Sequence, residues 1–137
     1  DGPEMDNLRK FITHENVNVN FMGKLDRERV YSVLDQTSVF IMISKNEAFG
    51  LVYLEAMLNR NIVIASKNDG FDGIIKDGIN GFLCTAGDSD ELSQILIKIL
   101  EMPREKLLEI QKQSFLTASK MTDAKMAHRY LEIIEEL

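Results

Sequence analysis

A run of five apolar residues followed by a helical pattern constrains this chain more than any other feature. The run extends from Val39 to Ile43, and the helix is expected from Phe49 to about Asn59. A short, uninterrupted apolar run is typical of a strand buried on both faces of a parallel sheet. The expected helix is apolar on nearly every face, which predicts that it lies inside the domain. A buried strand that leads into a buried helix indicates an α/β fold.

One acidic residue, Glu55, lies in the middle of this apolar helix. Burying a carboxylate costs free energy unless a partner stabilises the charge. Gly50 allows a ligand to approach the backbone closely, and a helix N-terminus there leaves the amides of Gly50, Leu51 and Val52 available to an anion. Because helical side chains lean toward the N-terminus, we expect Glu55 to point back toward that anion site.

A second acidic residue, Glu47, comes just before the helix, at the carboxyl end of the strand, where open α/β sheets bind ligands. Two carboxylates with an anion site between them suit a diphosphate that carries a hydroxyl-rich group at each end. A plainer interpretation stays open for each: Glu55 as a helix-face acid in contact with water, and Glu47 as an acid favoured by the helix dipole. Phe49 and Leu51 are expected to lie partly in the core, so that only their backbone would contact a ligand.

Strand and helix patterns alternate along the chain, which predicts a Rossmann-like parallel sheet flanked by helices, in a single domain over residues 1–137. The expected strands are Val17–Met22, Val39–Ser44, Ile62–Ala65 and Gly81–Cys84. The expected helices are Glu4–Thr13, Arg27–Gln36, Phe49–Asn59, Asp90–Glu101, Pro103–Ser119 and Ala124–Leu137, the fourth capped by Asp88 or Ser89. Three aspartates in the connections are interpreted as loop formers: Asp69, Asp72 and Asp77.

The composition excludes several classes of function. The 137 residues carry a net charge of −6, which argues against generic nucleic-acid binding, because such binding depends on neutralising phosphates. The single cysteine, Cys84, has no partner for a disulfide or at zinc spacing, so we expect it to be buried and the protein to be cytoplasmic. His14 and His128 are expected on the surface, and no metal site is predicted. No apolar run approaches membrane-spanning length.

Several motifs, in order, resemble the retaining glycosyltransferases of the GT4 type, which have the GT-B fold. Glu47 and Glu55, with seven residues between them, resemble the E-x7-E motif of that family. Asp77-Gly-Ile-Asn-Gly-Phe-Leu83 resembles its DG-x-NG-F-L turn and strand. Asp1-Gly-Pro-Glu4 resembles the end of its G-x-GP loop, and Val19-Asn-Phe-Met-Gly23 resembles its V-x-F-x-G strand.

The resemblance implies the C-terminal, nucleotide-sugar-binding half of such an enzyme. In the family the second glutamate of the motif, here Glu55, holds the ribose hydroxyls. The first, here Glu47, contacts the donor sugar and is the candidate catalytic residue. The other candidates for donor binding are the helix start, Phe49, Gly50, Leu51 and Val52, and the turn Gly23, Lys24 and Leu25, which would border the base.

The implied reaction transfers a sugar from a nucleotide diphosphate sugar to an acceptor hydroxyl with retained configuration, as hexosyltransferases do in glycan or polysaccharide biosynthesis. Enzymes of this fold generally need no divalent metal, and no cofactor is expected. The acceptor, a glycan or a lipid-linked compound, would be bound by an N-terminal domain that is not among these 137 residues. Any membrane association would arise through that domain, and the 137 residues alone are expected to be inactive.

Two departures limit what the resemblance implies. Asp69-Gly-Phe-Asp-Gly73 stands where the family usually has a Gly-Gly-x-Pro-Glu-like loop, so the contacts of that loop are not carried over. The arginine and lysine that grip the diphosphate in the family lie upstream of the G-x-GP loop, outside this sequence.

Two alternatives belong to other functional classes. A retaining glycoside hydrolase would use Glu47 and Glu55 as acid and nucleophile, but such a pair requires carboxyl groups ~5–5.5 Å apart. Eight residues of helix rise about 12 Å, which weighs against this alternative. A non-catalytic module that binds sugar nucleotides stays open, although neither a P-loop nor a G-x-G-x-x-G motif is present.

The resemblance also predicts an incomplete sheet. A common doubly wound sheet has the strand order 3-2-1-4-5-6, and this chain aligns with strands three to six. The strand at Val17–Met22 would then be separated from the strand at Val39–Ser44 by a gap two strands wide. Because buried backbone groups need partners, we expect either that the polypeptide continues upstream of Asp1 or that another chain fills the gap.

Overall fold

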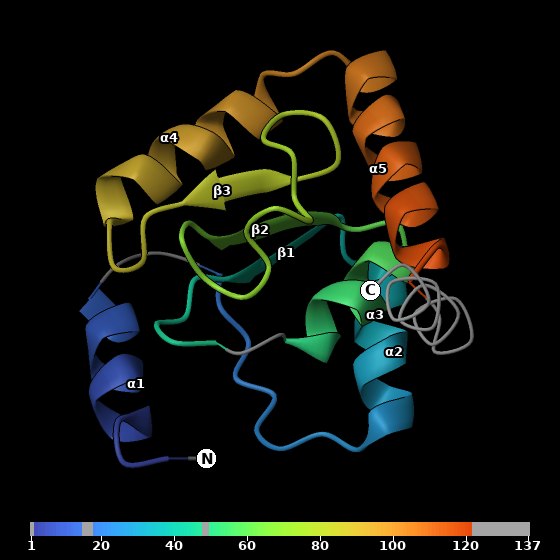
Figure 1. The fold of residues 1–137 in the computed structure, drawn as a ribbon. Helices are drawn as coiled ribbons and strands as arrows, with labels where there is room; N and C mark the ends of the chain where they lie inside the picture. Colours follow the sequence, from blue (N-terminus) through green and yellow to red (C-terminus); the bar gives the residue numbers. More distant parts are fainter. Residues whose placement is uncertain (1, 15–17, 48–49, 122–137) are drawn as a thin grey trace, which may run out of the picture. The chain divides into compact units, whose positions relative to one another are not determined.

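The computed structural model describes residues 2–14, 18–47 and 50–121, and the chain divides into two compact units, residues 1–30 and residues 31–137. The first unit contains α1 (Met5–His14) and the start of α2 (Arg27–Gln36). The second contains the rest of α2 and the elements β1 (Val39–Met42), α3 (Leu51–Leu58), β2 (Ile62–Ser66), β3 (Phe82–Cys84), α4 (Ser89–Leu100) and α5 (Arg104–Ser119) (Figure 1).

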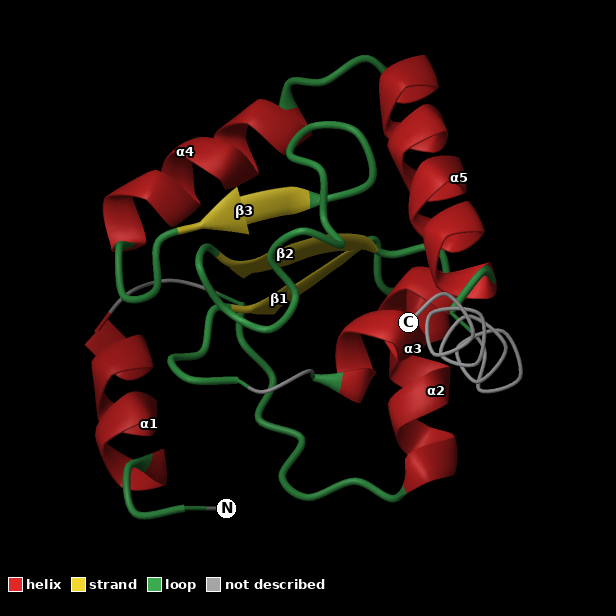
Figure 2. Ribbon diagram, in the orientation of Figure 1, coloured by secondary structure: helices red, strands yellow, loops and turns green. Residues whose placement is uncertain are grey.

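The three strands form a parallel sheet in the order β1-β2-β3 (Figure 2). Val39 pairs with Ile62, and Ile64 pairs with Phe82. All five residues of the central strand β2 are buried, which explains why its sequence is apolar without alternation. The predicted α/β class with a parallel sheet flanked by helices is confirmed, and the strand order agrees with the last three strands of a doubly wound sheet.

The main core lies on one face of this sheet. Ile62 and Ile64 point to the same face because they alternate along β2, and there they pack with Phe82, Ile99 and Ile110. Ile99 comes from α4, which lies along β3, and Ile110 comes from α5, which packs against β2 and α3 (Figure 1). The amphipathic pattern of α4 therefore serves to cover the sheet.

The predicted bounds of most elements agree with the structure within one or two residues. Asp88 is the N-cap of α4, as one of the two predicted choices, and its carboxylate accepts a 2.9 Å hydrogen bond from the Glu91 amide. The prediction that Cys84 is buried is also confirmed. Within the described part of the chain, the helices do not combine the length and hydropathy that crossing a bilayer requires.

The predicted strand at Val17–Met22 is wrong. Residues 18–22 form no strand, and within the described ranges β1 pairs only with β2. An apolar, alternating segment becomes a strand only when a neighbouring strand satisfies its amide and carbonyl groups, and the sequence pattern alone does not report that neighbour. The predicted helix Ala124–Leu137 lies outside the described residues.

Helix α3 is less buried than its composition predicts. Tyr53, Ala56 and Met57 are buried, but Leu51 is 68% exposed and Leu58 is 46% exposed. A helix of two turns that packs on one side buries a stripe rather than its whole circumference. The structure thus places Leu51 on the surface, where its side chain does not contribute to the core.

Candidate functional site

The N-terminus of α3 is built around Gly50. This residue is the N-cap, with φ 65° and ψ 66° in the left-handed region, and its carbonyl oxygen accepts a 2.9 Å hydrogen bond from the Tyr53 amide. A Cβ atom at this position would lie 2.6 Å from the Tyr53 ring and 3.2 Å from Cγ of Glu47. Only glycine therefore fits, for reasons of conformation and of space. The next amides, those of Leu51 and Val52, lie in the first turn, where backbone donors have no acceptor within the helix.

Glu47 is held beside this helix start by its backbone. Its amide donates a 3.0 Å hydrogen bond to the Asp69 carboxylate, and its carbonyl oxygen accepts a 3.1 Å hydrogen bond from the Gly70 amide. Both partners belong to the loop that follows β2, so the two neighbouring loops at the carboxyl ends of β1 and β2 are joined at Glu47. The half-buried side chain of Glu47 is left to face the helix start.

Tyr53 supports this arrangement from inside, a role that the sequence did not reveal. Its ring is 1% exposed and lies between Phe71, stacked at 4.7 Å between centroids, and Phe40, edge-on at 6.0 Å. Burial raises the pKa of the Tyr53 hydroxyl, and the negative charges of Glu47 and Asp69 raise it further. Tyr53 is therefore a neutral, rigid support beneath Gly50 at physiological pH.

Glu55 is half-buried on α3, and Tyr31 of α2 is a partner of its carboxylate that the sequence did not identify. The Tyr31 hydroxyl donates a 3.1 Å hydrogen bond to Oε1 of Glu55. The helix thus brings Gly50, Leu51, Val52 and Glu55 together within two turns, with Glu47 beside Gly50.

The remaining candidates are not placed with this group. Phe49 lies outside the described residues. Gly23, Lys24 and Leu25 belong to the other compact unit, in the turn before α2. Gly23 has a φ of 63°, so this turn uses the left-handed conformation that glycine tolerates. Asp26 directly precedes α2, and its carboxylate accepts a 2.9 Å hydrogen bond from the Arg29 amide.

The aspartate, the first glycine and the asparagine of the DG-x-NG-F-L segment, residues 77–83, have structural roles. The Asp77 carboxylate accepts a 2.9 Å hydrogen bond from the Leu83 amide, and Gly78 takes a φ of 70° in the turn. The buried Asn80 side chain accepts from the Lys76 amide at 2.7 Å and donates to the Ile74 carbonyl oxygen at 3.0 Å. The segment builds a turn and provides an acceptor for one amide of β3; its aspartate is a loop former, as predicted.

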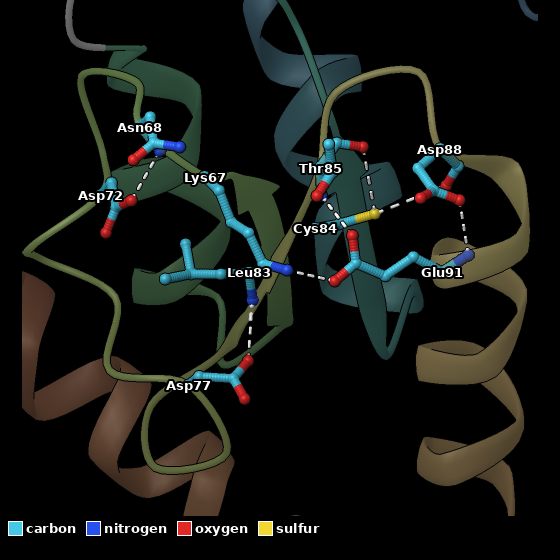
Figure 3. Close-up of polar contacts among 9 residues, drawn as sticks. All are labelled: Lys67, Asn68, Asp72, Asp77, Leu83, Cys84, Thr85, Asp88 and Glu91. Atoms are coloured by element: carbon cyan, nitrogen blue, oxygen red, sulfur yellow. Dashed lines mark hydrogen bonds and ion pairs between the residues drawn. The ribbon is translucent and has the colours of Figure 1, made fainter.

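A charged cluster lines a pocket of about 410 Å³ between β3, the loop after β2 and α4 (Figure 3). Lys67 forms an ion pair with Glu91, whose carboxylate also accepts a 2.7 Å hydrogen bond from the Thr85 amide. The hydrogen bond from Lys67, followed by those from Thr85, lowers the pKa of Glu91 to about 2. Asp72 accepts a 2.6 Å hydrogen bond from the Asn68 amide, which again makes the aspartate a loop former. These charges stabilise one another, and the described residues contain no group of acidic, histidine or cysteine side chains suited to a metal ion.

Comparison with known proteins agrees with this architecture. The model of the family "Glycosyl transferases group 1" matches residues 1–115. The chain is 31% identical over 103 residues to the N-acetyl-alpha-D-glucosaminyl L-malate synthase of Bacillus anthracis. The aligned region covers 74% of this chain and 26% of that protein. The chain therefore spans about a quarter of the length of this curated relative.

Among solved structures, Alr3699/HepE of Anabaena, in complex with UDP and glucose, is 30% identical with a TM-score of 0.80. The match covers 98% of this chain and 38% of that one. The C-terminal domain of the group 1 glycosyl transferase LpcC from Francisella tularensis has the same fold, with a TM-score of 0.76 at 21% identity over 88% of this chain and 65% of that one. The sheet and its helices match the C-terminal domains of GT-B glycosyltransferases, and the chain belongs to the glycosyl transferases group 1 family.

Proposed function

We propose that this domain binds the nucleotide diphosphate sugar of a retaining glycosyltransferase of the GT4 type. The observation that carries the proposal is the N-terminus of α3, which begins at a left-handed Gly50 with Glu47 beside it, while Glu55 lies farther along the same helix. The similarity to Alr3699/HepE, solved with UDP and glucose, supports the same class of donor.

Each candidate has a role that its position suits. The amides of Gly50, Leu51 and Val52 would bind the diphosphate, because a helix N-terminus attracts negative charge. Glu55, within the helix, would accept hydrogen bonds from the ribose hydroxyls. Glu47, on the other side of the amides, would contact the donor sugar. The backbone of Phe49 and the turn Gly23, Lys24 and Leu25, which would border the base, are the other candidates for donor binding.

The reaction would break the bond between the anomeric carbon and the diphosphate oxygen and form a bond from that carbon to the acceptor oxygen with the same configuration, the proton of the acceptor hydroxyl passing to the leaving diphosphate. The domain would contribute mainly by positioning the donor and by stabilising the charge on the leaving diphosphate. Neither a divalent metal nor a cofactor would take part. The acceptor, a glycan or lipid-linked compound, would be bound by an N-terminal domain, consistent with the quarter of a relative's length that this chain spans.

Saturation-transfer NMR against UDP-, GDP- and ADP-sugars, with and without EDTA, tests the proposal. One of the three should bind, and EDTA should leave that binding unchanged. Calorimetry should then show that Glu55→Gln weakens the binding of the nucleotide by about 1–3 kcal/mol, the scale of a lost hydrogen bond to a charged group. Glu109→Gln is the matched control, because Glu109 is exposed on α5, where its carboxylate accepts a hydrogen bond from Gln113.

Unchanged nucleotide affinity in Glu55→Gln, with an unaltered unfolding midpoint, would remove Glu55 from the site. If none of the three sugar nucleotides binds, the proposed function is wrong.

A further inference from the structure

Tyr31 and Glu55 belong to different helices and are 24 residues apart, yet their side chains meet. The Tyr31 hydroxyl donates its hydrogen bond to Oε1 of Glu55 over 3.1 Å, in a half-buried position. Tyr31 shares a face of α2 with Leu34, one turn later, and Leu34 is only 4% exposed. The tyrosine thus lies on the face of α2 that is packed into the protein.

The position of this face is fixed by a buried polar residue, Asn61. Its side-chain amide donates to the carbonyl oxygens of Leu34, at 2.9 Å, and Ala56, at 3.3 Å. Its side-chain oxygen accepts a 2.8 Å hydrogen bond from the Thr37 hydroxyl. Asn61 is fully buried, so these bonds are shielded from water and join the end of α2 directly to α3 beside Glu55.

A glutamate side chain has three rotatable bonds, and a ligand that needs one orientation of its carboxylate must otherwise bear the cost of ordering it. A hydrogen bond to Oε1 from a residue on a rigidly held helix restricts these rotations. A carboxylate has about four acceptor positions, and the tyrosine hydroxyl takes up one of them. Precise orientation of binding groups by supporting residues is a general requirement of such sites.

We propose that Tyr31 is a positioning residue, whose hydroxyl orients the Glu55 carboxylate toward the two ribose hydroxyls of the donor. This inference rests on the proposed function, because it assigns Glu55 to the ribose. It predicts that Tyr31 controls how strongly the site prefers a nucleotide with ribose hydroxyls over one that lacks them.

The test uses calorimetry on the full-length protein with the nucleoside diphosphate of the sugar nucleotide that binds, and with its 2′,3′-dideoxy form. Tyr31→Phe keeps the ring and removes the hydroxyl. It should weaken the ribonucleotide by about tenfold, which corresponds to about 1.4 kcal/mol, and leave the dideoxy form unchanged. Ser32→Ala is the matched control, because it removes a hydroxyl from the neighbouring, exposed position of α2. It should change neither affinity.

A double variant completes the design. If Tyr31 acts through Glu55, then Tyr31→Phe combined with Glu55→Gln should bind no more weakly than Glu55→Gln alone. Two results would overturn the positioning role while the proposed function stands: Glu55→Gln weakens binding and Tyr31→Phe does not, or Tyr31→Phe weakens both ligands equally, as a structural defect would. If Glu55→Gln has no effect on either ligand, the ribose site itself is wrong and the role of Tyr31 is wrong with it.

Discussion

The hydroxyl of Tyr53 donates a 2.5 Å hydrogen bond to the carbonyl oxygen of Met42, and so joins α3 to the last residue of β1. This bond fixes the helix start against the carboxyl end of the strand, where Gly50 and Glu47 lie. Ser66 makes a similar link one strand along, since its hydroxyl donates to the Ser44 carbonyl oxygen at 2.6 Å. The hydrogen bonds of Tyr53 and Ser66 at the carboxyl ends of β1 and β2 therefore support the candidate site.

Tyr53→Phe should lower the free energy of unfolding by about 1–3 kcal/mol, because it leaves the Met42 carbonyl oxygen without this donor in a partly buried position. Urea unfolding measures the loss. Ser93→Ala is the control: its hydroxyl bonds the Ser89 carbonyl oxygen on an exposed helix face, so its loss should change stability by no more than about 0.5 kcal/mol. Equal effects of the two substitutions would contradict a supporting role for Tyr53.

Gly50→Ala should lower the free energy of unfolding by more than the cost of placing alanine in a left-handed conformation. That conformation costs roughly 1–2 kcal/mol for a residue with a Cβ atom, and here the Cβ would also lie 2.6 Å from the Tyr53 ring. Gly78→Ala separates the two effects, because Gly78 has a similar φ of 70° but no atom within 4 Å of the Cβ position. If denaturant unfolding gives the same loss for both variants, the Tyr53 ring moves aside and the steric argument fails.

Glu47→Ala should reduce turnover in the full-length enzyme while the affinity for the nucleoside diphosphate stays nearly the same. The hydrogen bonds of Glu47 to Asp69 and Gly70 come from its backbone, so alanine preserves them and removes only the carboxylate. Steady-state kinetics and calorimetry on the same preparation measure the two quantities. Comparable losses in both would instead make Glu47 a structural residue of the loop.

Acidification should weaken the link between β2 and α4. The pKa of Glu91 is lowered from its usual 4.5 to about 2 in the folded protein, so its contribution to stability is complete above pH 4.5 and is lost as the pH falls toward 2. Glu91→Gln should therefore reduce the difference in stability between pH 5 and pH 2.5, measured by urea unfolding. Glu109→Gln on the surface of α5 should leave this difference in stability unchanged. If Glu91→Gln keeps the pH dependence of the wild type, the ion pair of Lys67 and Glu91 is not the source of that dependence.

The sequence alone predicted most of the local elements. Periodicity and continuous apolar runs located β1, β2 and β3, and the helices of the described residues, because each of those patterns reports burial within a few residues of chain. The approach of a ligand to the backbone at Gly50 stays a prediction; the structure adds a different requirement for glycine, a left-handed conformation with the Tyr53 ring beside it.

Only the tertiary structure decided what supports the candidate site. Tyr31, which donates to Glu55, is 24 residues away from it in the sequence. Asn61 joins Leu34 to Ala56, and its carbonyl oxygen accepts a 3.1 Å hydrogen bond from Ser114, 53 residues later. Residues 18–22 alternate like a strand but form none, since a strand exists only with a neighbour. Local sequence reports which face of an element is apolar; the hydrogen-bond partners depend on which elements the whole chain brings together.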